Sequence, residues 1–126
     1  MRRSLITMAV LVIVVGICTS EIWFLDSTIE YFTQEIKSIE DLIDDEKMED
    51  AYQKALDLNQ AWTEKYQLIS TFIEHQPLQE IDETFFLMTT LLAQEQKEDF
   101  FSESSRAINE LQHLKDTETP SLSNLL

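Results

Sequence analysis

Glycine and proline are nearly absent from this chain, which limits its possible folds more than any other feature does. Gly16 is the only glycine among 126 residues, and no proline occurs before Pro77. Tight hairpin turns, β-sandwiches and glycine-rich phosphate loops need residues that tolerate positive φ. The sequence therefore predicts an all-α protein, and its length allows one domain of ordinary size.

The charges are strongly acidic and unevenly placed. The formal net charge is −15, and the only charged residues before Glu21 are Arg2 and Arg3. From Glu21 onward, 24 acidic residues face seven basic ones, which gives −17. Such a charge argues against binding nucleic acid, whose phosphates would repel the chain. A single cysteine excludes an intrachain disulfide framework and a cysteine-based zinc site.

An apolar stretch follows the two arginines and predicts a membrane anchor over residues 5–25. A helix from Leu5 to Leu25 would be about 31 Å long, enough for the hydrocarbon core. The arginines predict a cytoplasmic N-terminus, and Trp23 and Phe24 suit the far interface. We therefore expect a single-pass protein of the cell membrane with its acidic domain outside the cytoplasm, held away from anionic headgroups by repulsion.

A cleaved signal peptide is the main alternative for this segment. It has the same basic start and apolar middle, and Cys18-Thr19-Ser20 offers small residues at a cleavage position. The apolar character continues past that cleavage position, from Ile22 to Leu25, which a cleaved signal peptide does not require. An uncleaved anchor is therefore preferred. Ile17 stands where a lipoprotein signal needs a small residue.

Apolar residues at steps of three and four predict about four amphipathic helices after the anchor. The first stripe runs from Leu25 to Ile43, and a polar break with capping aspartates follows at residues 44–47. The second runs from Met48 to Ile73 and stops at Gln76, because a residue before proline disfavours helix. The third spans 78–92, and the fourth spans 100–114 and fades over 115–120.

These stripes predict an N-terminal transmembrane helix followed by an antiparallel bundle of two α-hairpins. The domains would be the anchor at 1–25, the acidic bundle at 26–116, and a C-terminal tail at 117–126 whose leucines pack back on the bundle. The alternative to a plain bundle is a tetratricopeptide-like pair of hairpins. The alternative to a packed tail is a frayed C-terminus.

His75 is the candidate ligand-binding residue, because carboxylates surround it in the sequence. With Glu74 and Asp82 it suggests a weak metal site or a pH-sensitive latch. The alternative is a histidine that satisfies carbonyls at a helix C-terminus. The dense acids between Asp41 and Asp50 lack the EF-hand order and favour a solvated turn.

Aromatic residues give two further candidate surfaces. Trp62 and Tyr66 share one helical face, which is typical of core packing rather than of a ligand platform. Phe86 and Phe101 each follow another phenylalanine, and neighbours point about 100° apart on a helix. If Phe86 or Phe101 lies outside the core, it would form an apolar patch on an acidic surface, so these two are the candidate interaction residues. The alternative, which is favoured, is that all four phenylalanines belong to a wide buried stripe of the bundle.

No catalytic motif is present. The chain lacks a Gly-x-Ser-x-Gly elbow, a His-Glu-x-x-His helix and a Cys/His pair. The sequence predicts neither an enzyme nor a cofactor.

The order of these features resembles the bacterial DUF4363 family. The similarity lies in Phe72-Ile73-Glu74-His75 and in the terminal Leu122-Ser123-Asn124-Leu125-Leu126. The chain departs from the family pattern at Met48, where an aromatic is usual, and at Tyr66, where tryptophan is usual. The resemblance implies a short single-anchor helical protein of Gram-positive bacteria with no established activity, and a neighbouring multi-pass membrane protein as the first partner to test.

The sequence therefore predicts a membrane-anchored extracytoplasmic helical interaction module that docks on another membrane protein or on itself. Its partners would be the bilayer, through residues 5–25, and that protein or a second copy. The alternative is an envelope sensor that responds to divalent cations or pH through its carboxylates and His75.

Overall fold

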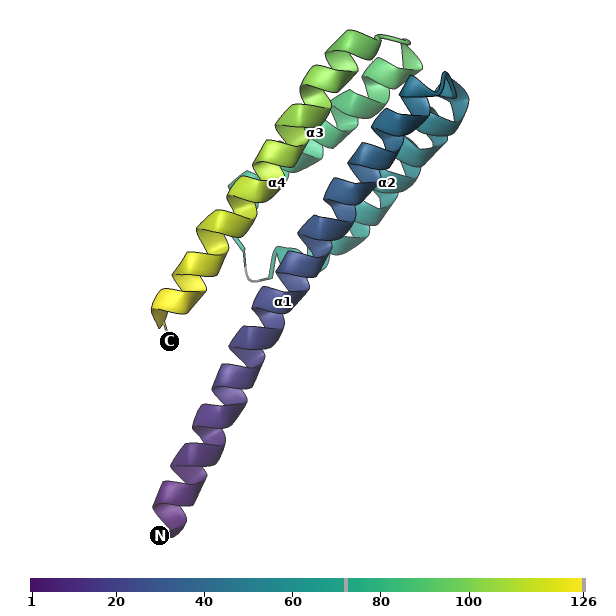
Figure 1. Ribbon diagram of the computed structural model, residues 1–126. Helices are drawn as coiled ribbons and strands as arrows, with labels where there is room; N and C mark the ends of the chain where they lie inside the picture. The colour runs from purple at the N-terminus through teal and green to yellow at the C-terminus, as the bar shows by residue number, and fades with distance from the viewer. Residues whose placement is uncertain (72, 126) are drawn as a thin grey trace.

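The computed structural model shows four helices and no strand among the residues it describes, 1–71 and 73–125, with side chains described as far as residue 117. The helices are α1 (Arg2–Asp44), α2 (Met48–Ile69), α3 (His75–Ala93) and α4 (Lys97–Leu125). Successive helices run antiparallel, so the α1–α2 and α3–α4 turns lie at one end and the α2–α3 turn at the other (Figure 1). The prediction of an apolar N-terminal helix followed by a helical bundle is confirmed.

The four helices form a square in which each helix contacts two neighbours. Contacts join α1 to α2, α2 to α3, α3 to α4 and α4 to α1. The side chains that fill the centre are aromatic: Trp62 of α2 packs its ring 5.3 Å from both Phe32 of α1 and Phe85 of α3. Trp62 is 1% exposed, so the prediction that it belongs to the core is confirmed.

The predicted apolar stripes are largely the buried faces of the helices. The whole first stripe is buried, and so is the whole third. In α2 the buried set also includes Ala51 and Leu58, which lie beside the predicted stripe. These buried stripe residues are Leu25, Ile29, Phe32, Ile36, Ile39 and Ile43 in α1, and Leu78, Ile81, Phe85, Met88 and Leu92 in α3.

Polar contacts cross each of the four helix interfaces. They join Lys54 to Ser38 and Glu35 (α2–α1), Asn59 to Thr89 (α2–α3), Thr84 to Glu110 (α3–α4), and Lys115 to Asp26 (α4–α1). Apolar packing tolerates helices that slide by a turn, whereas a hydrogen bond requires specific atoms to meet. These contacts therefore fix the register of the bundle.

The α1–α2 and α3–α4 turns have the same backbone structure. In each, a glutamate takes the left-handed conformation just after the helix, Glu46 with φ 62° and Glu95 with φ 56°. The next amide donates to the carbonyl five residues back, Lys47 to Leu42 and Gln96 to Leu91. This is the Schellman motif, whose left-handed position is usually glycine. The predicted capping of α2 by an aspartate is wrong, because its N-cap is Lys47 with no side-chain hydrogen bond.

The boundary between α2 and α3 differs from the prediction. The second helix ends at Ile69 rather than at Gln76, and His75 and Gln76 already belong to α3. The sequence pattern predicts that Pro77 follows a helix end, whereas it lies in the first turn of α3. The first amides of a helix have no intrahelical partner, so a proline there costs no hydrogen bond.

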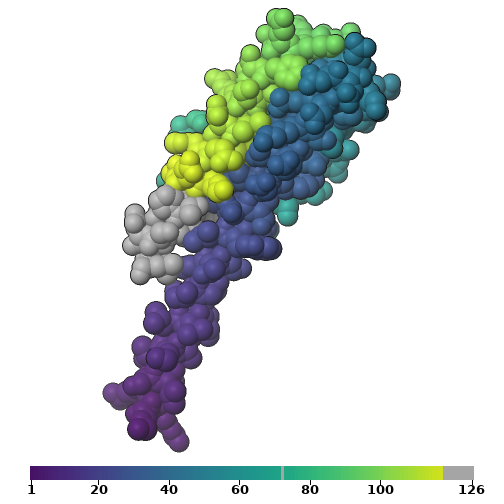
Figure 2. All heavy atoms as spheres, in the orientation of Figure 1, coloured from purple at the N-terminus to yellow at the C-terminus, as the bar shows by residue number. Residues whose placement is uncertain are grey.

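α1 passes from the apolar segment into the bundle without a break. Leu25, the last residue of the predicted anchor, is 2% exposed and belongs to the bundle core. Residues 1–17 are exposed and project beyond the body of the molecule (Figure 2). At the other terminus α4 continues to Leu125, past the predicted fading at 115–120. The predicted packing of the tail leucines concerns side chains outside the described residues.

Candidate functional site

A polar groove of about 810 Å³ lies between α3 and α4. Four glutamates line it, against one arginine and one histidine, so the groove is negatively charged. Leu87, 39% exposed, and Pro77 are its apolar residues, and the hydrocarbon parts of the polar side chains add to its apolar surface. The lining residues are Pro77, Glu80, Glu83, Thr84 and Leu87 of α3, and Ser102, Glu103, Ser105, Arg106, Asn109, Glu110 and His113 of α4.

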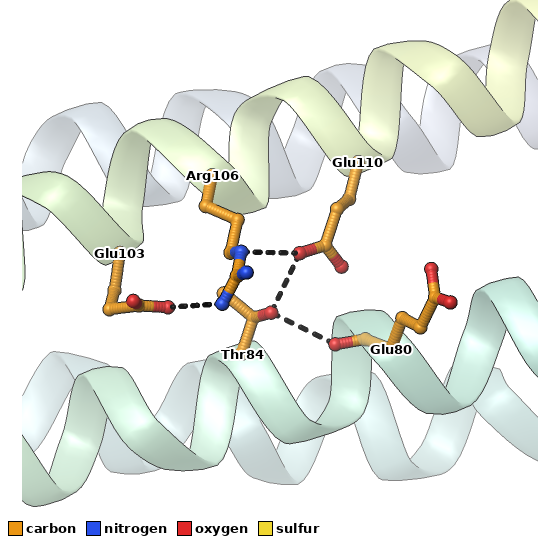
Figure 3. Close-up of polar contacts among 5 residues, drawn as sticks. All are labelled: Glu80, Thr84, Glu103, Arg106 and Glu110. Carbon is orange, nitrogen blue, oxygen red and sulfur yellow. Dashed lines mark hydrogen bonds and ion pairs between the residues drawn. The ribbon is translucent and has the colours of Figure 1, made fainter.

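Thr84 connects the two walls of this groove (Figure 3). Its hydroxyl lies 2.8 Å from Glu110 Oε1 on α4 and 2.9 Å from the main-chain oxygen of Glu80 on its own helix. A hydroxyl has one proton to donate, so only one of these oxygens can receive it at a time. Two acceptor oxygens, Glu110 Oε1 and the main-chain oxygen of Glu80, therefore compete for the single hydroxyl proton of Thr84.

Arg106 is the cation of the groove, and it lies between two glutamates of α4 (Figure 3). One of its terminal nitrogens is 3.6 Å from Glu103 Oε2, and its Nε is 3.9 Å from Glu110 Oε1. Both distances exceed those of a good charge-assisted hydrogen bond. The arginine side chain is 64% exposed, whereas those of Glu103 and Glu110 are 20% and 19% exposed.

Each of these two glutamates keeps one carboxylate oxygen without a hydrogen-bond donor. Oε2 of Glu103 and Oε2 of Glu110 are buried and accept no hydrogen bond. Burial raises the pKa of Glu110 above its ordinary value, and the Thr84 hydroxyl and Arg106 oppose this less strongly. A buried acceptor without a donor costs free energy, so these oxygens would gain from a donor supplied by another molecule.

Sequence reasoning missed this site, although part of its pattern is visible. Glu103, Arg106 and Glu110 stand three and four residues apart, which places them on one face of a helix. That spacing alone is common on solvated helices. Thr84 lies 26 residues away from Glu110, and only the register of α3 against α4 brings the two together.

The predicted ligand residues around His75 are not gathered into a site. His75 is exposed in the first turn of α3, where its ring stacks on Tyr66 at 6.5 Å between centroids. The prediction of a histidine at a helix C-terminus is therefore wrong. Glu74 is the exposed N-cap of α3, and Asp82 lies seven residues from His75, about 10 Å along the helix.

The acidic residues at the α1–α2 turn are all exposed, as expected for a solvated turn. They are Asp41, Asp44, Asp45, Glu46, Glu49 and Asp50. Within the described residues, no three histidines, cysteines or carboxylates come close enough together to hold a metal ion.

The two candidate interaction residues have different surroundings. Phe86 is 70% exposed on α3, whereas Phe101 is half-buried and packs against the core beside Phe100. Phe86 is two residues, or about 200°, around α3 from Thr84, so it points away from the groove. The two phenylalanines therefore do not share the α3–α4 groove.

The apolar part of α1 lies outside the bundle core. α1 is the one helix among the described residues that is long and apolar enough to span a membrane, and its most apolar window is entirely unburied. A core helix of a soluble protein or a signal sequence can have the same length and composition. The exposed position of this window distinguishes it from a core helix of the bundle.

An exposed apolar helix that continues into an acidic four-helix bundle defines a small all-α protein with a possible N-terminal membrane span. The chain belongs to the DUF4363 family, described as a domain of unknown function, because residues 21–125 match the family model. The predicted family is thereby confirmed. Comparisons with curated proteins and with solved structures give no match.

Proposed function

We propose that this protein is a single-pass membrane protein whose bundle stands outside the cytoplasm and docks on another membrane protein through the α3–α4 groove. The observation that carries the proposal is the pair of buried Oε2 atoms of Glu103 and Glu110. Neither accepts a hydrogen bond, and the Arg106 nitrogen nearest to Glu103 Oε2 is 3.6 Å away. A partner segment with lysine or arginine side chains would supply donors and opposite charge together. The proposed activity is binding, without catalysis.

The membrane part of the proposal rests on the distribution of charge along α1. Arg2 and Arg3 precede the exposed apolar segment, and the next basic residue is Lys37. Basic residues are retained on the cytoplasmic side, so this asymmetry favours an N-terminus inside the cell. A tethered module needs little intrinsic affinity, because the membrane raises its effective concentration near an anchored partner.

Site-specific cross-linking in cells tests the docking surface. A photoreactive residue at Asn109, which is exposed in the groove, should form a cross-link with a membrane protein. The matched control is the same residue at Gln53, exposed on α2. The cross-link at Asn109 should weaken several-fold when Glu103 and Glu110 are both changed to glutamine, while the helical circular dichroism stays the same.

The outcomes of this experiment separate the possible partners. A heterologous membrane protein captured at position 109 and lost with the double glutamine variant supports the proposal. A cross-link between two copies of this chain would make the groove a self-association surface. Equal capture from positions 53 and 109, or no capture from position 109, would contradict docking at the groove.

A further inference from the structure

We infer that the base of the bundle rests in the interfacial layer of the bilayer. The basal surface comprises Trp23 and the shallow groove formed by Ser20, Glu21, Phe24 and Leu68. This inference rests on the proposed membrane anchor, and the occupant to which it commits is the lipid surface around that anchor. The argument uses the length of the apolar segment, the level of α2 beside it and the distribution of charge.

The uncharged segment is too short to lift the bundle off the membrane. Only 17 residues, 4–20, separate Arg3 from Glu21. As a helix they span about 26 Å, against about 30 Å for the hydrocarbon core. Glu21 therefore falls at the lipid boundary, and the first core residue, Leu25, follows only about 6 Å further along the same helix. No linker lies between the apolar segment and the bundle.

The end of α2 lies level with this boundary. Lys65 Nζ lies 5.3 Å from the centre of the Phe24 ring, and Leu68 shares the shallow groove with Ser20 and Glu21. Leu68 therefore stands at the level where α1 leaves the hydrocarbon core.

Two large apolar side chains are exposed at that level. Trp23 is 70% exposed and Leu68 is 53% exposed. An exposed tryptophan at the end of an apolar segment is typical of the membrane interface, where its ring has an apolar body and a polar N–H group. Contact with the interfacial layer would remove both side chains from water, and continuity with the apolar segment identifies lipid as what covers them.

The densest cluster of acidic residues does not oppose this contact, because it lies at the end of the bundle far from the membrane. The acidic α1–α2 turn includes Asp44, which is 23 residues beyond Glu21 and therefore about 35 Å away. The Debye length at physiological salt is about 8 Å, so headgroups at the base are screened from that turn. Near the base, Lys65 lies over Phe24 and Lys115 pairs with Asp26 at 2.9 Å. Glu21, Asp26 and Asp116 also lie near the base, and the two lysines offset part of their negative charge. The strongest repulsion therefore acts far from the base.

Fluorescence quenching by lipid measures the depth of the basal surface. The full chain, with Cys18→Ala, would carry one environment-sensitive fluorophore on a cysteine at position 68, 56 or 12. It would be reconstituted in vesicles of phosphatidylglycerol and phosphatidylethanolamine in equal parts, with a lipid that bears a nitroxide near its headgroup for positions 68 and 56, and in the middle of its acyl chain for position 12. Leu56 is the matched control for Leu68, because it is an exposed leucine of α2 about 18 Å further from the membrane. Val12 reports the anchor itself.

The inference predicts that quenching at position 68 is several-fold greater than at position 56, with strong quenching at position 12. Quenching at 12 with equally weak quenching at 68 and 56 would overturn the basal contact and leave the anchor intact. Absence of quenching at 12 would overturn the proposed anchor, and the inference with it. Trp23 gives a label-free reading in the Trp62→Phe chain, where brominated lipid should quench its emission; unchanged emission would count against the basal contact.

Discussion

Trp62 packs edge-on against Phe32, with ring centroids 5.3 Å apart and ring planes at 83°. This pair joins α1 to α2 at the centre of the bundle, and Phe85 of α3 completes it. Trp62→Ala should lower the free energy of unfolding by about 3–5 kcal/mol, because it leaves a cavity among three helices. Urea denaturation of the full chain in mild detergent, followed by circular dichroism, measures the loss.

The control for this prediction is Phe86→Ala. Phe86 is 70% exposed, so its truncation in detergent should change the free energy of unfolding by no more than about 0.5 kcal/mol. An equal effect of the two substitutions would mean that Trp62 is not at the centre of the core.

Glu95→Gly should stabilise the protein by about 1 kcal/mol. Glu95 has a φ of 56°, a conformation that costs about 1–2 kcal/mol for a residue with a Cβ atom and little for glycine. Part of that gain is offset because glycine makes the unfolded chain more flexible. The gain is read from the urea midpoint of the full chain.

Glu95→Ala is the matched control, since it removes the carboxylate and keeps the Cβ atom. It should give little or none of the gain. A similar stabilisation by alanine and glycine would assign the effect to charge instead of to backbone conformation. Glu46→Gly should reproduce the glycine result at the α1–α2 turn, where φ is 62°.

Glu110 should make the bundle more stable as the pH falls from neutral. Its folded-state pKa is raised above the ordinary 4.5, chiefly by burial, so the folded chain binds a proton at a higher pH than the unfolded chain does. Unfolding free energy should therefore rise as the pH falls through that raised pKa, and the gain should be complete near the ordinary value. At neutral pH the ionised side chain carries the whole burial penalty.

Glu110→Gln should flatten this part of the pH dependence, because glutamine does not titrate. Glu83→Gln is the control, since Glu83 is an exposed carboxylate that lines the same groove. Glu40, whose pKa burial and the neighbouring Asp41 also raise, contributes in the same direction and remains in both variants. The same slope in the two variants would rule out Glu110 as a source of the effect.

The proposed orientation makes a labelling prediction in intact cells. In a Cys18→Ala background, a cysteine at Gln53 should react with a membrane-impermeant maleimide, and one at Ser4 should react only after lysis. Gln53 is exposed on α2 and Ser4 adjoins the two arginines. Labelling at position 4 but not at position 53 in intact cells would reverse the orientation.

The helical stripes and the first break could be predicted from the sequence because they depend on local patterning. The residues from Leu25 to Ile43 repeat every three or four positions, and Asp44 and Asp45 interrupt that repeat. The α2–α3 boundary could not be placed, because proline is compatible with both the first turn of a helix and the position just after one. Pro77 alone does not distinguish the two.

The candidate site depends on the pairing of helices, which periodicity leaves open. Nothing in the sequence sets Thr84 opposite Glu110 instead of one turn higher or lower. The left-handed glutamates were equally hidden, since Glu46 and Glu95 occupy positions where glycine is the usual signal. The phenylalanines at 86 and 101 were recognised as candidates, but only packing decides that Phe86 stays exposed and Phe101 does not.

The unbroken backbone of α1 fixes the height of the α3–α4 groove above the membrane, and therefore the distance that a partner segment must span. Lys115 pairs with Asp26 across α1 and α4, so Glu110 stands level with about residue 31 of α1, roughly 15 Å beyond Glu21. No hinge in α1 would allow the groove to bend down toward the lipid. A partner in the same membrane must therefore extend its own chain to that height, which takes about five extended residues on the way up and as many on the return.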